Sequence, residues 1–159
     1  MMKSLVLLAS LAAFAGAAAS QAAEAGDPRG RWITASGNLE VEVAPCGDAL
    51  CGTVVRVLAN HSMQPGGREM KPADPRDPMG MKLLTGFVPS EFVETGGDKR
   101  PTEWRGQIYN RENAKTYSCV MTLGDGGALI LRGYVGLPMF GRTSAWRRVD
   151  VSAGSASTQ

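Results

Sequence analysis

The sequence predicts an all-β protein, a small antiparallel up-and-down barrel of about eight strands. Short runs in which apolar and polar residues alternate recur along the chain, as half-buried strands require. Glycine, proline and asparagine mark the turns between these runs, and no convincing helical pattern follows the first residues. A closed barrel is favoured because closure removes exposed strand edges. The predicted strands cover residues 30–34, 39–43, 50–58, 83–88, 104–109, 115–123, 128–135 and 142–149.

Composition indicates an ordinary globular protein with a single domain. The 159 residues are 43% hydrophobic and 20% charged, which fits one folded unit at residues 26–150 and a disordered Ser/Ala/Gly tail at residues 151–159. The formal net charge is only +2. No electrostatic footprint for nucleic acid or an anionic membrane surface stands out, and nucleic acid is not an expected partner.

Residues 1–19 have the features of a cleavable signal peptide. Lys3 supplies the positive start, residues 5–15 are an apolar run too short to span a bilayer, and small residues precede the cleavage position. Cleavage is predicted after residue 19, with Ala22 and Ala23 as alternatives. No other stretch approaches about 18 consecutive apolar residues, so we do not expect an integral membrane protein. The predicted location is periplasmic or secreted.

Three cysteines follow the predicted leader. Cys46 and Cys51 flank a four-residue turn between two strands, and an oxidising compartment would let this pair form a disulfide. A metal site at this pair is less favoured because no second pair of cysteines or histidines completes four ligands. Cys119 lies in a strand pattern and is expected to be a buried thiol, with a reactive nucleophile as the alternative.

The first three strands have clear patterns. In the second strand, alternation predicts an inner and an outer face, with Leu39, Val41 and Val43 buried and Glu40 and Glu42 in water. The third strand, residues 50–58, is rich in β-branched residues and pairs with the second across the cysteine turn. Asn38, after a glycine, makes the turn between the first two strands.

Residues 59–82 contain several prolines and glycines and form a long predicted loop. Loops longer than about 12–15 residues are usually functional or mobile. The methionines of this loop are expected to pack as a lid over the barrel mouth. A weaker alternative is a Cu(I) site, because imidazole and thioethers are soft ligands, with candidates His61, Met63, Met79 and Met81.

The remaining strands contribute the candidate interior. A second loop is predicted at residues 94–101, between the fourth and fifth strands. The sixth strand alternates, a glycine-rich turn at residues 124–127 follows, and Leu129, Leu131 and Val135 share one face of the seventh strand. If the barrel holds a cavity, its tentative lining is Trp104, Tyr109, Tyr117, Met121 and Leu131. The alternative is that these side chains pack against each other.

Catalysis is not expected. A Ser-His-Asp or Cys-His arrangement needs a histidine base, and the single His61 lies at the start of the long loop. Asp74 and Asp77 are the nearest paired carboxylates, but both precede proline, as is common in turns. We also expect no cofactor.

The two ends of the predicted barrel carry a short motif. The Gly-x-Trp of Gly30 and Trp32, with an arginine near the chain's end, resembles the lipocalin-like (calycin) barrels, in which the arginine packs on the indole. The resemblance implies a structural latch at barrel closure that consists of Gly30, Trp32, Trp146, Arg147 and Arg148. Either Arg147 or Arg148 could contact Trp32.

A second resemblance covers nearly all of residues 30–149. Separated strings occur in order, namely CGDALCG at 46–52, DPMG at 77–80, LTGF at 84–87, WRGQIYN at 104–110, KTY at 115–117 and GYVG at 133–136 followed by FGRT at 140–143 and Trp146. They resemble the exported bacterial family catalogued as domain of unknown function 2147, which is associated with small calycin-like barrels and carries no agreed ligand or activity. The chain departs from that pattern at Asn113-Ala114, where a glycine before Lys115 is usual.

These observations give three functional hypotheses. The first is a non-enzymatic exported barrel that binds a small apolar or amphipathic molecule in its interior. The second is an envelope structural or interaction protein with a filled barrel, whose protein partner is unknown. The third and weakest is Cu(I) binding by the methionine-containing loop.

Overall fold

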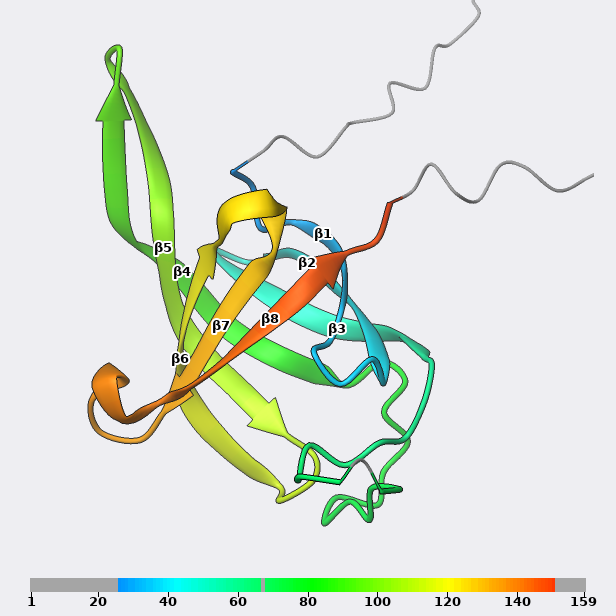
Figure 1. Ribbon diagram of the computed structural model, residues 1–159. Helices are drawn as coiled ribbons and strands as arrows, with labels where there is room; N and C mark the ends of the chain where they lie inside the picture. Colours follow the sequence, from blue (N-terminus) through cyan, green and yellow to red (C-terminus); the bar gives the residue numbers. More distant parts are fainter. Residues whose placement is uncertain (1–25, 67, 151–159) are drawn as a thin grey trace, which may run out of the picture.

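The strands of the computed structural model pair in chain order, and the last returns to the first to close a barrel (Figure 1). The structure describes residues 26–66 and 68–150, so the predicted signal peptide and the tail at 151–159 lie outside the described residues. Every pairing is antiparallel, which confirms the predicted up-and-down barrel. The elements are β1 Gly30–Ile33, β2 Leu39–Cys46, β3 Ala49–Val57, β4 Lys82–Thr95, β5 Asp98–Asn110, β6 Lys115–Leu123, η1 Asp125–Gly127, β7 Leu129–Tyr134, η2 Pro138–Phe140 and β8 Arg142–Arg148.

A continuous hydrophobic core occupies the barrel interior. Alternate residues of the strands point inward, and each large apolar side chain that is fully buried contributes roughly 1.5–3 kcal/mol of burial free energy. The largest fully buried side chains are Trp32, Phe87, Leu84, Met121, Leu129, Leu131, Val41, Val43, Val54 and Cys119. Residues from all parts of the barrel therefore stabilise one shared core.

An up-and-down barrel has two ends, and the connections alternate between them. One end, which we call the latched end, carries the segment before β1, the β2–β3 turn and the β4–β5 turn. The other, the lidded end, carries the long β3–β4 connection of residues 58–81, which we call the lid (Figure 1). The β1–β8 seam is short, with only Trp32 opposite Arg148 and Ile33 opposite Arg147.

The predicted loop at residues 94–101 is wrong. β4 and β5 continue through it and pair as far as Thr95 and Asp98, with only Gly96 and Gly97 between them, both at positive φ. This hairpin projects beyond the barrel as an arm (Figure 1). Its residues are exposed on both faces, so the alternation that reveals half-buried strands is absent there.

Two predicted side-chain environments are also wrong. Glu40 is buried rather than solvated, because Arg56 of β3 and Arg31 of β1 flank its carboxylate at 2.7 and 3.4 Å. The long arginine stems cover the acid on the outer face of the barrel. Val135 does not face the core, since β7 ends at Tyr134 and Val135 is exposed.

The cysteines take the predicted forms. Cys46 and Cys51 form a disulfide with their Cα atoms 5.8 Å apart, across the turn that contains Gly47 at positive φ. Disulfides are typical of compartments outside the cytoplasm. Cys119 is buried, and this burial raises the pKa of its thiol to about 12, so it is not a thiolate nucleophile at neutral pH. The described residues include no helix with the length and apolar character that a membrane span requires.

Candidate functional site

At the latched end, Arg148 stacks on Trp32. The guanidinium lies 4.1 Å from the centroid of the indole ring, within the range of a cation–π contact. Its two terminal nitrogens donate to the carbonyl oxygens of Arg29 and Asp27 at 2.9 and 2.6 Å, while Trp32 Nε1 donates to Pro28 O at 2.8 Å. Partial burial lowers the pKa of Arg148. The stack thus ties the segment before β1 across the end of the barrel.

The other predicted latch residues have distinct positions. Gly30 has a φ of 125°, and a Cβ atom there would lie only 2.8 Å from Nη1 of Arg148, so a side chain would be strained and crowded. Trp146 is buried in the core opposite Leu129. Arg147 is exposed, so Arg148 is the arginine that contacts Trp32.

A groove of about 610 Å³, the latch groove, opens beside this stack. The segment before β1, the disulfide turn and the arm form its sides. Phe87 and Trp104, both buried in the core, form its floor, and Leu50 and Val93 add further apolar surface. The groove therefore lies against the margin of the hydrophobic core, between three separate elements of the fold.

Charged groups lie among the lining residues of the latch groove. Arg100 of the arm lines it and is exposed. The exposed Asp48 of the disulfide turn also lines it, as does Asp27, which pairs with Arg29. Although burial raises the pKa of Asp27, hydrogen bonds and charge from Arg29 hold it below its ordinary value. An apolar floor with charged groups along its sides can accept a molecule that has an apolar part and a polar or anionic head group.

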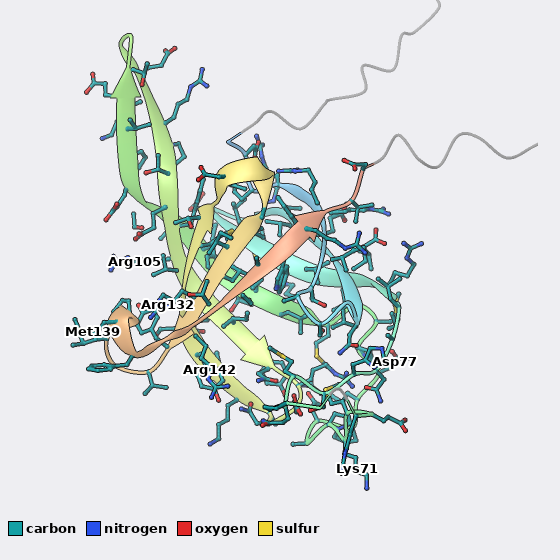
Figure 2. All side chains as sticks on the ribbon, viewed as in Figure 1. Lys71, Asp77, Arg105, Arg132, Met139 and Arg142 are labelled. Atoms are coloured by element: carbon teal, nitrogen blue, oxygen red, sulfur yellow. A yellow bond between two sulfur atoms is a disulfide. The ribbon has the colours of Figure 1, made fainter. Side chains whose placement is uncertain are left out.

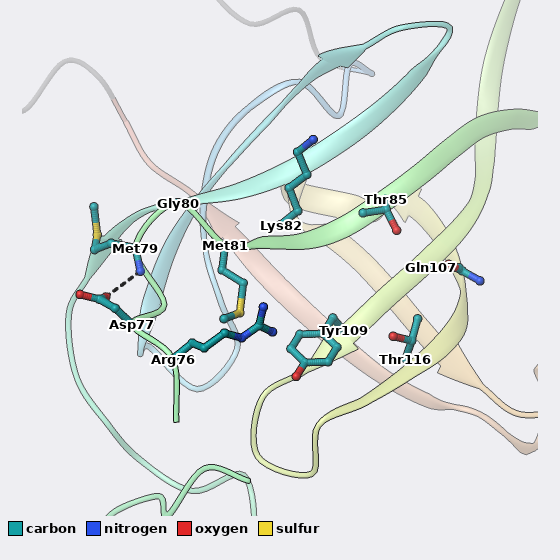
Figure 3. Close-up of a pocket in the computed structure, with 10 residues that line it drawn as sticks. All are labelled: Arg76, Asp77, Met79, Gly80, Met81, Lys82, Thr85, Gln107, Tyr109 and Thr116. Atoms are coloured by element: carbon teal, nitrogen blue, oxygen red, sulfur yellow. Dashed lines mark hydrogen bonds between the residues drawn. The ribbon is translucent and has the colours of Figure 1, made fainter. Parts of the chain in front are cut away.

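A second groove, the lid groove, has a volume of about 510 Å³ and lies where the lid joins β4 (Figure 3). Tyr109 donates its hydroxyl hydrogen to Asp74 at 2.6 Å, and Arg76 Nε donates to the same carboxylate at 2.9 Å. The Arg76 and Tyr109 hydrogen bonds hold the pKa of Asp74 well below its usual range, and Asp74 in turn raises the pKa of Tyr109. The Asp74 carboxylate therefore stays ionised and bound to Tyr109 and Arg76, which anchors the lid, whereas a catalytic acid must carry a proton that it can donate.

The lid is tied to turns on both sides of the barrel mouth. The Asn38 side chain exchanges two hydrogen bonds with the backbone of His61, each 2.7 Å long. On the other side, the Glu112 carboxylate accepts from the hydroxyl of Ser62 and, at 3.1 Å, from the Met63 amide. Because Asn38 belongs to the β1–β2 turn and Glu112 to the β5–β6 turn, the lid spans the mouth.

The five residues proposed to line a cavity occupy different environments. Trp104, Met121 and Leu131 are buried in the core, and of these only Trp104 lines the latch groove. Tyr109 pairs with Thr116, whereas Tyr117 pairs with Ile108, so the two tyrosines lie on opposite faces of the sheet. Tyr109 lines the lid groove, and Tyr117 lines neither groove.

The four candidate copper ligands are also divided. Met79 and Met81 line the lid groove, and Met81 packs against the core. Met63 is strongly exposed, and neither it nor His61 lines that groove. Within residues 26–66 and 68–150, no group of three or more His, Cys, Asp or Glu residues could hold a metal ion.

A family model matches residues 30–148 of the chain, and its description is "uncharacterized protein conserved in bacteria (DUF2147)". The chain belongs to the DUF2147 family. The match spans every strand of the barrel, from β1 to β8. Among curated proteins, none matches the chain significantly.

One solved structure similar to this DUF2147 barrel is protein HP1028 from Helicobacter pylori, which is described as a member of the lipocalin family. The two share 18% sequence identity with a TM-score of 0.51, over 79% of this chain and 85% of that chain. At this identity the likeness concerns the fold. The predicted lipocalin-like barrel is confirmed, and the sites must be argued from the residues of this chain.

Proposed function

We propose that this DUF2147 protein is a non-enzymatic exported barrel that binds a small amphipathic molecule in the latch groove. The observation that supports this most directly is a groove of about 610 Å³ that reaches Phe87 and Trp104 at the margin of the core. Its volume lies within the roughly 300–1,000 Å³ of small-molecule sites. The apolar part of the ligand lies against this floor, and an anionic head group lies near Arg100.

The proposal differs from a ligand enclosed in the barrel interior. Met121 and Leu131, which would line an interior site, are fully buried among other core side chains. A ligand at that position would have to displace packed side chains, which is costly in interiors of native density. The latch groove avoids this cost because it lies outside the packed core.

A titration with a dansyl-labelled fatty acid tests the proposal. Its fluorescence should rise on transfer from water into the groove and saturate at one equivalent. Val93→Ser removes apolar lining from the groove and should weaken binding about tenfold, since a large apolar side chain contributes roughly 1.5–3 kcal/mol when it is covered. Arg100→Gln should weaken binding of the fatty acid more than binding of the corresponding alcohol, because only the fatty acid is anionic.

Val88→Ser is the matched control. Val88 lies on the same strand and is as exposed as Val93, at 47% each, but it does not line the latch groove. The Val88→Ser variant should bind the probe with the same affinity as the unmodified protein. Absence of a saturable signal, or equal losses from both valine variants, would overturn the latch groove as the site.

A second candidate is an interaction protein with a filled barrel. The continuous core and the projecting arm favour it, because Phe92 and Val93 are large apolar side chains exposed on that arm. The fatty-acid titration separates the two functions. If the chain is an interaction protein, the unmodified protein should give no saturable fluorescence signal. Native mass spectrometry should then detect no bound small molecule.

A further inference from the structure

The β7–β8 connection displays a cluster of exposed apolar side chains away from both grooves. We call these four residues the apolar tip: Val135, Leu137, Met139 and Phe140, which are 75%, 56%, 72% and 76% exposed. Scattered exposed apolar residues are common on proteins, but several within one turn indicate an interaction site. None of the four lines the latch groove or the lid groove.

The backbone of the apolar tip is held in place by Arg132 of β7. Its guanidinium donates to the carbonyl oxygens of Pro138 and Met139 at 2.6 and 3.0 Å, and to Thr143 Oγ1 at 2.7 Å. Gly141 brings the turn close to β7, since a Cβ there would lie 2.6 Å from Gly133 O. The apolar side chains are therefore presented on a fixed turn.

Two arginines lie next to the apolar tip. Residues 126–149 contain four arginines and no carboxylate, but Arg147 and Arg148 lie at the far end of β8 against β1, so of these four only Arg132 and Arg142 are near the tip. Arg132 lies under the tip, and the exposed Arg142 follows it directly (Figure 2). Arg105 lies on the same side of the barrel but is paired with Glu103 at 2.8 Å. The charge that bears on a partner is therefore mainly that of Arg132 and Arg142.

We propose that the apolar tip docks on the surface of an anionic lipid bilayer, with Met139 and Phe140 in the acyl–headgroup boundary and Arg142 against lipid phosphates. A bilayer interface offers both phases within a few ångströms, an apolar one for the side chains and an anionic one for the guanidiniums. A projecting turn suits a deformable surface, whereas a complementary protein would need a matching cavity. Attachment is peripheral, and it is salt-sensitive because salt screens the exposed charge of Arg142.

Flotation of the purified protein with vesicles tests this docking. Vesicles of phosphatidylglycerol and phosphatidylethanolamine should bind the protein, and those of phosphatidylcholine should bind it more weakly. Met139→Ser/Phe140→Ser should lower the vesicle partition coefficient at least about tenfold, because burial of one Phe side chain alone contributes this much. Arg142→Gln should lower it about fivefold on anionic vesicles only, the usual effect of one basic residue near such a surface.

Met63→Ser/Phe92→Ser is the matched control, with the same substitutions at exposed positions of the lid and the arm. It should bind vesicles as the unmodified protein does. Lack of vesicle binding by the unmodified protein, or equal losses from both double variants, would overturn the proposal. So would sedimentation showing a dimer that Met139→Ser/Phe140→Ser dissociates, since a second copy would then cover the tip. The Met139→Ser/Phe140→Ser variant should still bind the fatty acid normally. Such a result would show that vesicle docking and ligand binding in the latch groove are independent.

Discussion

The two ends of the barrel are closed in different ways. At the latched end, residues of the strands themselves make the closure, because Trp32 lies in β1 and Arg148 in β8. At the lidded end, a separate connection crosses the mouth and is held by polar side chains of two turns and of the lid itself, chiefly Asn38, Glu112 and Asp74. The closure at the latched end is part of the hydrophobic core, whereas the closure at the lidded end is a separate polar attachment outside the core.

This difference predicts different responses to damage. Loss of a latch contact exposes core aromatic surface and weakens the β1–β8 seam, which has only two residue pairs. It should therefore lower the stability of the whole barrel. Loss of a lid bond leaves all eight strands paired, so the lid should open as a local unit while the barrel stays folded. The latched end is thus the better support for a preformed groove.

Arg148→Ala should have the largest effect. It removes the stack on Trp32 and the two hydrogen bonds to the carbonyls of Asp27 and Arg29. A partly buried cation–π contact and charge-assisted hydrogen bonds together predict a loss of about 2–4 kcal/mol in the free energy of unfolding. Urea denaturation followed by tryptophan fluorescence measures it directly.

Arg147→Ala is the control for the latch. Arg147 is the neighbouring residue, carries the same charge and is exposed. Its replacement should change the free energy of unfolding by less than about 0.5 kcal/mol, as surface substitutions usually do. Equal effects at the two positions would mean that general charge, and no specific stack, stabilises the seam.

The sequence was sufficient for the barrel because its core strands alternate and its turns are marked. β2 and β6 have clear inner faces, and glycines define the turn at residues 124–127. The arm could not be predicted in the same way, because strands that project into solvent on both faces have no buried face to reveal their period. Burial of Glu40 was also hidden, since it depends on arginines of two neighbouring strands.

The candidate site was less accessible to sequence reasoning. Trp104 was among the predicted lining residues, but Tyr109 and Tyr117 were both predicted to line one cavity, although strand register places them on opposite faces of the sheet. The lid anchors involve pairs far apart in the chain, such as Asn38 with His61, and no local pattern announces them. The acceptors of the Arg148 hydrogen bonds are likewise backbone carbonyl oxygens, and the identity of a residue does not reveal where its backbone carbonyl will point.

Asn38→Ala should have an intermediate and local effect. Asn38 is buried, and its loss leaves the His61 amide and carbonyl without their partners. His61 is exposed, so water can reach these groups, and the loss is that of two ordinary hydrogen bonds at about 0.5–1.5 kcal/mol each. Amide hydrogen exchange at His61 and Met70 should therefore accelerate about 5- to 150-fold. Exchange in β1 and β8 should not change. Asn113→Ala serves as the control, because that exposed residue bonds only within its own turn and strand.

The smallest effect at neutral pH concerns titration of the lid anchor. The pKa of Asp74 is held below its ordinary 3.8, so its contribution to lid closure is complete above that value and is lost only as the pH falls through the lower, folded pKa. The pKa of Tyr109 is raised above 10.0, so its contribution is complete below that value and is lost as the pH rises through the folded pKa. The lid should therefore stay anchored across this whole interval.

Carbon-13 NMR of the Asp74 carboxyl group measures this titration. Its chemical shift should stay constant down to pH 3.8. Tyr109→Phe removes one donor, leaves the Arg76 pair in place, and should move the Asp74 titration part of the way back toward its ordinary pKa. Tyr117→Phe, which removes a hydroxyl bonded to Asn113 instead, should leave it unchanged. If Asp74 titrated at 3.8 in the unmodified protein, the lid would be anchored by Asn38 and Glu112 without it, and the two ends would differ even more sharply in the groups that close them.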